Sequence, residues 1–158
     1  MQISKSQTSN YENGQSLFEL VVAIAISALI IVAIVSLVTN SIQNSNYSKN
    51  KALASTYAQQ ATEWLRGQRD KDVSIFMTHA EIPTWCLMDI STDLKGWSKS
   101  GACGSGDFID GTPFTRQASF GITTQNGKNV VEADVSVSWA DSQGVHEVKS
   151  VTNLADLR

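Results

Sequence analysis

Residues 14–38 read GQSLFELVVAIAISALIIVAIVSLV, and this stretch decides how the rest of the chain is interpreted. Glu19 is its only charged residue, and after it only Ser27 and Ser36 are polar. The apolar run that starts at Leu17 has about 22 residues, so as a helix it would span about 33 Å, enough to cross the roughly 30 Å core of a bilayer. The sequence therefore predicts a membrane-length helix with one carboxylate near its start.

The carboxylate of Glu19 is unfavourable in such a segment. A charged side chain at the centre of a spanning helix costs roughly 2.5 to 3.5 kcal/mol on insertion scales unless a partner compensates it. A plain membrane anchor would account for the length of the run and for its lack of Lys and Arg, but not for this acid. We therefore treat Glu19 as a functional residue.

A cleaved secretory signal is a further interpretation of the run. Such a signal has a basic front end, a shorter apolar core and a small-residue cleavage site directly after the core. Here Lys5 is balanced by Glu12, the core is too long, and Thr39-Asn40-Ser41 follows it. These features argue against removal of the whole run, and the intact mass of the mature protein would reveal such a loss.

The residues around Gly14 resemble the leader of type IV prepilins. Gly14 is followed by Gln15-Ser16-Leu17-Phe18-Glu19 and then by the apolar run. In that family a membrane peptidase cuts after the glycine and methylates the new amino terminus. The resemblance implies a leader over residues 1–14, cleavage between Gly14 and Gln15, and N-methylation of Gln15. It also implies that Glu19 acts in assembly by pairing with the terminal amine of a neighbouring subunit, since a buried carboxylate is tolerable when paired.

Gln15 departs from the family pattern, in which the first mature residue is usually phenylalanine or another apolar residue. This difference concerns methylation more than cleavage. The resemblance implies four partners: other pilin or pseudopilin subunits, the prepilin peptidase, an inner-membrane assembly platform, and membrane lipid before assembly. It further implies a single-pass cell-membrane protein with an external C-terminal domain, located at the cell surface or in a periplasmic filament after assembly.

The apolar run passes into a polar segment without a helix breaker. Neither Gly nor Pro occurs between residues 15 and 66, so we expect one helix over about residues 15–70, with Gly67 as an earlier end. In its second half, apolar residues recur at helical spacing and predict one buried stripe: Leu53, Ala54, Tyr57, Ala58, Ala61, Trp64 and Leu65. Such a stripe indicates ordinary core packing against a globular head and requires no cofactor.

The C-terminal part of the chain shows the alternation of β-strands. Apolar residues alternate with polar ones over residues 114–122 and again over 131–139, and Asn126-Gly127 between them is a strong hairpin signal. A third, less regular strand is expected over 145–153. The pattern predicts a three-stranded antiparallel meander over residues 114–154 with one apolar face. A helix laid on this face gives an α+β fold, which is the architecture of type IV pilins and pseudopilins.

The head is expected to cover residues 71–158, and residues 72–111 are expected to be a variable loop of irregular structure. This loop contains the only two cysteines of the chain, Cys86 and Cys103. Outside the cytoplasm an even number of cysteines favours a disulfide, with free thiols as the alternative. A zinc site is disfavoured because the two histidines show no ligand spacing.

Four aspartates lie in or near the same loop: Asp89, Asp93, Asp107 and Asp110. Their spacing matches no calcium-binding loop, so we expect a solvated acidic surface and no metal site. The sequence contains no nucleophile motif, phosphate loop or zinc-protease motif, and a net charge of −3 gives no basic stripe for nucleic acid. The sequence thus predicts a non-enzymatic protein without a cofactor and without a clear nucleic-acid site.

Two functional hypotheses follow from these patterns. The first is a structural subunit of a type IV pilus-like or pseudopilus filament, either a minor pilin or a type II secretion pseudopilin, assembled through residues 17–38. The second is a single-pass, membrane-anchored binding domain outside the cytoplasm that does not polymerise. Glu19 distinguishes them, because a simple tether should tolerate Glu19→Ala and an assembling subunit should not.

Overall fold

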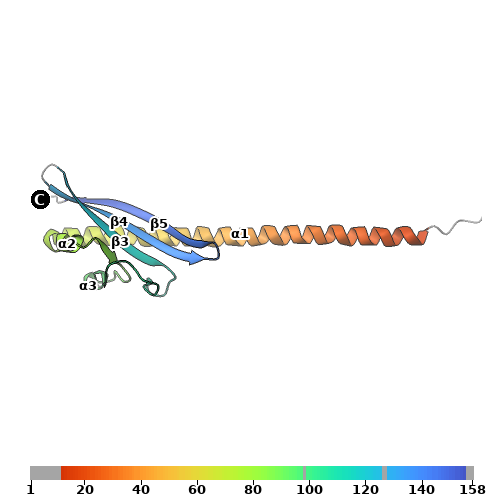
Figure 1. Cartoon of the computed structure of the whole chain (residues 1–158), viewed down its shortest axis with the longest axis horizontal. Helices are drawn as coiled ribbons and strands as arrows, with labels where there is room; N and C mark the ends of the chain where they lie inside the picture. The colour runs from red at the N-terminus through yellow and green to blue at the C-terminus, as the bar shows by residue number, and fades with distance from the viewer. Residues whose placement is uncertain (1–11, 98, 126–127, 156–158) are drawn as a thin grey trace, which may run out of the picture. The chain divides into compact units, whose positions relative to one another are not determined.

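The computed structural model describes residues 12–97, 99–125 and 128–155. Contacts divide the chain into two compact units, Met1–Asn46 and Tyr47–Arg158. The helices and strands, in chain order, are α1 (Glu12–Lys71), α2 (Val73–Ala80), β1 (Thr84–Cys86), α3 (Asp93–Gly96), β2 (Lys99–Ser100), β3 (Thr115–Gln125), β4 (Lys128–Asp141) and β5 (Gly144–Ala155) (Figure 1).

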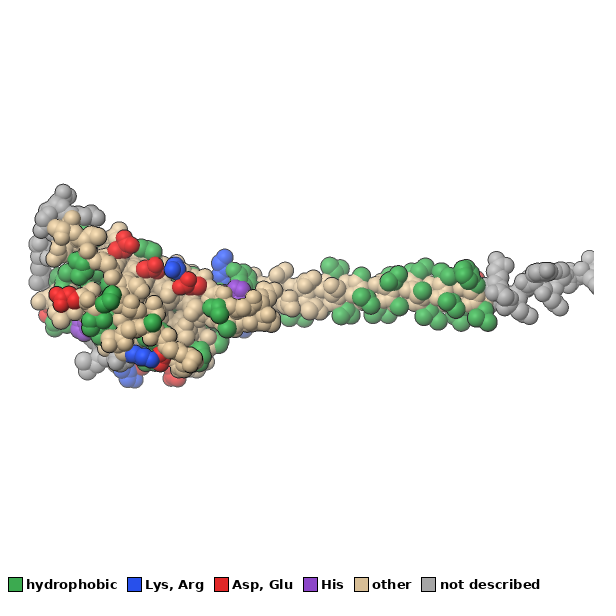
Figure 2. Space-filling view, in the orientation of Figure 1, with side chains coloured by type: hydrophobic (Ala, Val, Ile, Leu, Met, Phe, Trp, Pro, Cys, Tyr) green, Lys and Arg blue, Asp and Glu red, His purple; other side chains and the backbone are tan. Residues whose placement is uncertain are grey.

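The described part of the first unit is a helix whose side chains are exposed. Every side chain from residue 17 to residue 46 is exposed, apolar ones included, and Figure 2 shows hydrophobic side chains along this part of α1. By length and composition, α1 is the one helix in the described part of the chain that could cross a membrane. The hydroxyl of Ser27 donates to the carbonyl of Ala23 at 2.7 Å, so this polar group is satisfied within the helix.

Helix α1 begins and ends close to the expected positions, at Glu12 and Lys71. Gly67 lies within it and does not end it. The end has a local cause, because Asp72 adopts extended backbone (φ −154°, ψ 101°) and its carboxylate accepts hydrogen bonds from the backbone N–H groups of Ser74 and Ile75. Asp72 is therefore the N-cap of α2, and satisfying the free N–H groups of α2 stops α1.

In the second unit, all strand pairs are antiparallel and the sheet order is β2-β1-β3-β4-β5. The predicted meander is confirmed as β3, β4 and β5, which Figure 1 shows side by side. The predicted turn residues Asn126 and Gly127 lie outside the described residues.

The prediction that residues 72–111 form an irregular loop was partly wrong. This segment contains α2, β1, α3 and β2, and β1 extends the sheet by pairing Trp85 with Ala118 of β3. β1 has only three residues and β2 only two. Strands this short carry no readable alternation, so pairing of β1 with β3 and of β2 with β1, and not local sequence pattern, makes them part of the sheet.

The core lies between the second half of α1 and one face of the sheet. The α1 residues Ala54, Ala58, Ala61 and Leu65 are buried, and they belong to one cluster with the inward-facing strand residues, among them Val131, Ala133, Val135 and Val137. Three of these four α1 residues are alanines, so small side chains make up most of the buried face of the helix. The prediction was wrong for Leu53, the first residue of the stripe, which is 37% exposed. Its neighbour Ala54, also in the stripe, is fully buried.

Polar contacts tie α1 to the edge strand β5. The hydroxyls of Thr62 and Ser150 are hydrogen bonded at 3.2 Å, and Nη2 of Arg66 donates to the hydroxyl of Thr152 at 3.2 Å. Arg66 also pairs with Glu63 at 2.6 Å, because residues three positions apart lie on the same side of a helix. These contacts fix the register of α1 against the β5 edge of the sheet.

Candidate functional site

Glu19 lies on the exposed apolar part of α1. Its neighbours Phe18 and Leu20 are 71% and 60% exposed, and among the residues that the structure describes none pairs with the carboxylate. A carboxylate set among exposed apolar side chains needs a charged or hydrogen-bonding partner from another molecule once the apolar surface is covered. In the apolar part of α1, Glu19 is thus the residue that requires a partner group from a second molecule.

The predicted processing site falls at the beginning of α1. Gly14 and Gln15 lie within the first turns of the helix, but the side chains of residues 12–16 are outside the described set. The leader, residues 1–14, lies almost wholly outside the described residues. Cleavage after Gly14 and methylation of Gln15 therefore stay predictions from the sequence.

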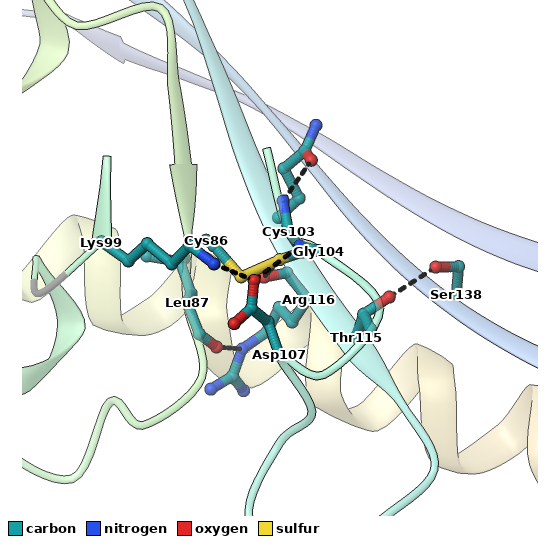
Figure 3. The surroundings of a disulfide bond; sticks show 10 residues. Cys86, Leu87, Lys99, Cys103, Gly104, Asp107, Thr115, Arg116 and Ser138 are labelled. Atoms are coloured by element: carbon teal, nitrogen blue, oxygen red, sulfur yellow. Dashed lines mark hydrogen bonds and ion pairs between the residues drawn. A yellow bond between two sulfur atoms is a disulfide. The ribbon is translucent and has the colours of Figure 1, made fainter. Parts of the chain in front are cut away.

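The disulfide is the first feature that organises the segment between β1 and β3. Cys86 and Cys103 are joined, with a Cα–Cα distance of 5.0 Å, which confirms the favoured pairing (Figure 3). The bond connects the last residue of β1 to the glycine-rich stretch that follows β2. The backbone N–H of Cys103 also donates to the side-chain carbonyl of Gln117 in β3, at 3.3 Å. The stretch is therefore held to two strands.

Two of the four loop aspartates hold this segment in place, so the prediction of a simply solvated acidic surface was incomplete. Asp107 accepts hydrogen bonds from Lys99 and from the backbone N–H of Gly104, and these bonds lower its pKa (Figure 3). Asp89 accepts from the backbone of Ser91 and pairs with Lys95 at 3.0 Å. The Ser91 bonds, followed by the Lys95 contact, lower the pKa of Asp89 to about 2.

The remaining two aspartates have different positions. The side chain of Asp93 is outside the described set, and Asp110 is exposed. Among the described residues, no group of three or more His, Cys, Asp or Glu side chains is arranged to hold a metal ion.

Sequence reasoning missed Arg116, a buried arginine in β3. It is 2% exposed and follows Phe114 by two positions on the inward face of the strand. Its Nε donates to the carbonyl of Leu87 at 3.0 Å (Figure 3), and its Nη1 donates to the carbonyl of Tyr57 at 3.5 Å. Burial lowers the pKa of Arg116 to about 10, although Asp89 and Tyr57 favour the charged form. The sequence signal that could have revealed Arg116 is a charged residue at a strand position where the alternation places apolar side chains.

Arg116 opens onto a surface groove of about 630 Å³, which we call the Arg116 groove. Its walls are Tyr57, Gln60 and Trp64 of α1, residues 88–91 after β1, and residues 109–110 before β3. The lining combines one buried cation with aromatic and aliphatic side chains and with two acids, Asp89 and Asp110. Recognition pockets have this composition: a mainly apolar surface with a few polar groups that orient the ligand.

A second pocket, of about 410 Å³, lies beside α2 and is lined in part by Phe76, His79 and Trp97. Its aromatic rings pack mainly on one another. His79 stacks on Trp97 with ring centroids 4.5 Å apart, and Trp97 lies 5.0 Å from Trp64. Nδ1 of His79 is also 2.9 Å from the carbonyl of Ile75 in the same helix. This histidine is therefore part of an aromatic cluster that holds α2 and α3 in the head.

The second histidine, His146, lies in β5 near the β4–β5 turn. Its Nε2 is 2.9 Å from Oδ1 of Asp141, and its ring lies 5.1 Å from that of Tyr47 on α1. The hydrogen bond from the backbone of Gln143, followed by that of His146, lowers the pKa of Asp141. Asp141 and His146 thus stabilise the β4–β5 turn and its contact with α1.

No family model, curated protein or solved structure matches this chain. Its function is therefore argued from the apolar half of α1, from Glu19, and from the disulfide-bonded head.

Proposed function

We propose that this protein is a structural subunit of a type IV pilus-like or pseudopilus filament. The observation that carries the proposal is the order of features at the start of the chain. Gly14 stands five residues before Glu19, and Glu19 stands at the head of the apolar part of α1, in which every side chain from residue 17 to residue 46 is exposed. In the proposal, a prepilin peptidase cuts after Gly14, the new terminus at Gln15 is methylated, and an inner-membrane platform then assembles the subunits.

The chemistry of α1 supports assembly through this helix. A helix that is apolar on all sides requires an apolar environment on all sides, first lipid and then the matching helices of neighbouring subunits. Within such a bundle the carboxylate of Glu19 needs compensation, and the amino terminus released at Gln15 of a neighbour supplies a cation at the same end of the helix. One pairing would thus satisfy the acid and set the register between subunits.

The head supports the location that this function requires. The Cys86–Cys103 disulfide is typical of proteins that fold outside the reducing cytoplasm. An external head on a membrane-spanning segment fits a single-pass protein whose C-terminal domain lies on the outer side. From there the head would face the outside of a filament or the tip partners of a minor pilin or secretion pseudopilin.

The decisive experiment is the determination of the mature N-terminus, by intact mass and terminal peptide sequencing of protein from native membranes. We expect a chain that begins at Gln15, with or without one methyl group. Gly14→Val should give the full-length precursor, while Ser16→Ala, a control two residues away, should still be cut. An uncut wild-type chain in cells that contain the peptidase would overturn the proposal.

A second candidate function is a membrane-anchored binding domain that does not polymerise, and the Arg116 groove favours it. The two functions separate at Glu19. Glu19→Gln keeps the size of the side chain and removes its charge, so an assembling subunit should lose incorporation into sheared filaments while its membrane level stays unchanged. A tether should show no difference between Glu19→Gln and wild type in any head-dependent activity.

A further inference from the structure

The guanidinium of Arg116 has one nitrogen left for a ligand. Nε and Nη1 donate to backbone carbonyls, whereas Nη2 makes no hydrogen bond within the described residues. In the same residues, the enclosed side-chain polar atoms without a partner are Trp64 Nε1, Asp134 Oδ1 and Trp139 Nε1. Nη2 is not among them and Arg116 lines the groove, so Nη2 is the donor that the groove exposes.

The positive charge of Arg116 is only partly compensated. The charge of Asp89 raises the pKa of Arg116, but the carboxylate of Asp89 is already bound by Lys95 and by the backbone of Ser91. The net effect of burial and of these charges is a lowered pKa, which means that desolvation outweighs the attraction. A buried cation in this state gains free energy from any acceptor that can reach it, and an anionic acceptor gives the strongest hydrogen bond.

The walls of the groove restrict the kind of anion. Met88, Ile90 and Ile109 offer apolar surface on the loop side, and Tyr57 and Trp64 offer it on the side of α1. The two acids in the lining disfavour a multiply charged group such as phosphate, and they repel a single carboxylate less strongly. The groove is largely open to solvent, which suits an extended chain better than an enclosed small molecule.

We propose that the Arg116 groove binds an extended segment of a partner protein, one that presents a single carboxylate between apolar side chains. The carboxylate accepts a charge-assisted hydrogen bond from Nη2 of Arg116, and the flanking apolar side chains lie against Tyr57 and Ile109. This inference does not depend on filament assembly, because an anchored binding domain would use the same groove.

The test compares two peptides of equal shape, acetyl-Leu-Glu-Leu-amide and acetyl-Leu-Gln-Leu-amide, each titrated against the full-length protein in lipid nanodiscs. Binding is followed by peptide-observed NMR. We expect the glutamate peptide to bind about tenfold more tightly, because a hydrogen bond between charged groups is worth about 1.5 kcal/mol or more. Equal affinities of the two peptides would overturn the proposal. It would also be overturned if the small carboxylate 3-phenylpropionate bound as tightly as the glutamate peptide.

Two variants locate the effect at the groove. Arg116→Gln keeps a donor for the Leu87 carbonyl but removes the charge, so the two peptides should bind equally. Because Arg116 also supports the fold, Asp110→Asn provides an independent test at an exposed position. Removing this negative charge should tighten binding of the glutamate peptide about threefold and leave the glutamine peptide unchanged, as expected for a solvent-screened charge pair.

The matched control is Glu132→Gln, which removes an exposed acid between the buried residues Val131 and Ala133 of β4 and therefore on the outer face of the sheet. It should alter neither affinity. Weaker binding of the glutamate peptide by Asp110→Asn, or an equal effect of Glu132→Gln, would show that the groove does not select a carboxylate.

Discussion

Two leucines of α1 allow the packing of the head to be tested with one substitution at two positions. Leu65 is fully buried in the cluster between α1 and the sheet, whereas Leu53 is 37% exposed. Leu65→Ala removes three buried carbons and leaves a cavity, which should lower the free energy of unfolding by about 3 kcal/mol. Leu53→Ala removes the same atoms from a position that water already reaches, so the loss should be about 1 kcal/mol.

The comparison isolates burial because other effects of the two substitutions cancel. Both positions lie within α1, and alanine favours the helix equally at each. We would measure urea unfolding of the full-length protein in nanodiscs by tryptophan fluorescence. With a urea dependence of about 1.5 kcal/mol per molar, Leu65→Ala should lower the midpoint by about 2 M and Leu53→Ala by about 0.7 M. Equal shifts would refute the assigned orientation of α1 on the sheet.

Three further predictions concern the loop segment. Replacing Cys86 and Cys103 by serine should lower the free energy of unfolding by about 3 kcal/mol, and thermal melts of wild type with and without reductant should show a matching difference. Gly96→Ala should destabilise by about 1–3 kcal/mol in denaturant titrations, because the added Cβ would overlap the ring of Trp64. Gly67→Ala, with open space around it in α1, should stabilise by about 0.5–1 kcal/mol. The lowered pKa of Asp89 means that the folded state binds fewer protons, so its contribution to stability is present above about pH 4 and is lost as the pH falls towards 2. Asp89→Asn should flatten the measured dependence of stability on pH in that window, and an unchanged slope would contradict the Ser91 and Lys95 contacts.

The position of Leu53 shows how far periodicity alone can go. Helical periodicity places both Leu53 and Ala54 in the stripe, but the core includes Ala54 and leaves Leu53 37% exposed. The rotation of an amphipathic helix by a fraction of a turn is thus decided by the partner surface, which the local pattern does not contain.

Arg116 shows the same limit for the candidate site. Its place in an alternating strand indicates the inward face, and this much is readable from the sequence. Its two backbone acceptors are not, because Tyr57 and Leu87 lie 59 and 29 positions away along the chain. The groove is likewise assembled from α1 and from two loop stretches that only the fold brings together.

The sequence by itself determined the apolar helix with its single acid, the α+β class, the meander of β3, β4 and β5, and the favoured disulfide partners. These features depend on local periodicity, on composition and on the presence of only two cysteines. Tertiary structure alone decided the rotation of α1, the addition of β1 and β2 to the sheet, the ion pairs of the loop aspartates and the burial of Arg116. The rotation of α1, the sheet pairing of β1 with β3 and the burial of Arg116 depend on groups distant in the chain. The ion pairs join residues six and eight positions apart, which are brought together by the conformation of the loop and not by a periodic pattern.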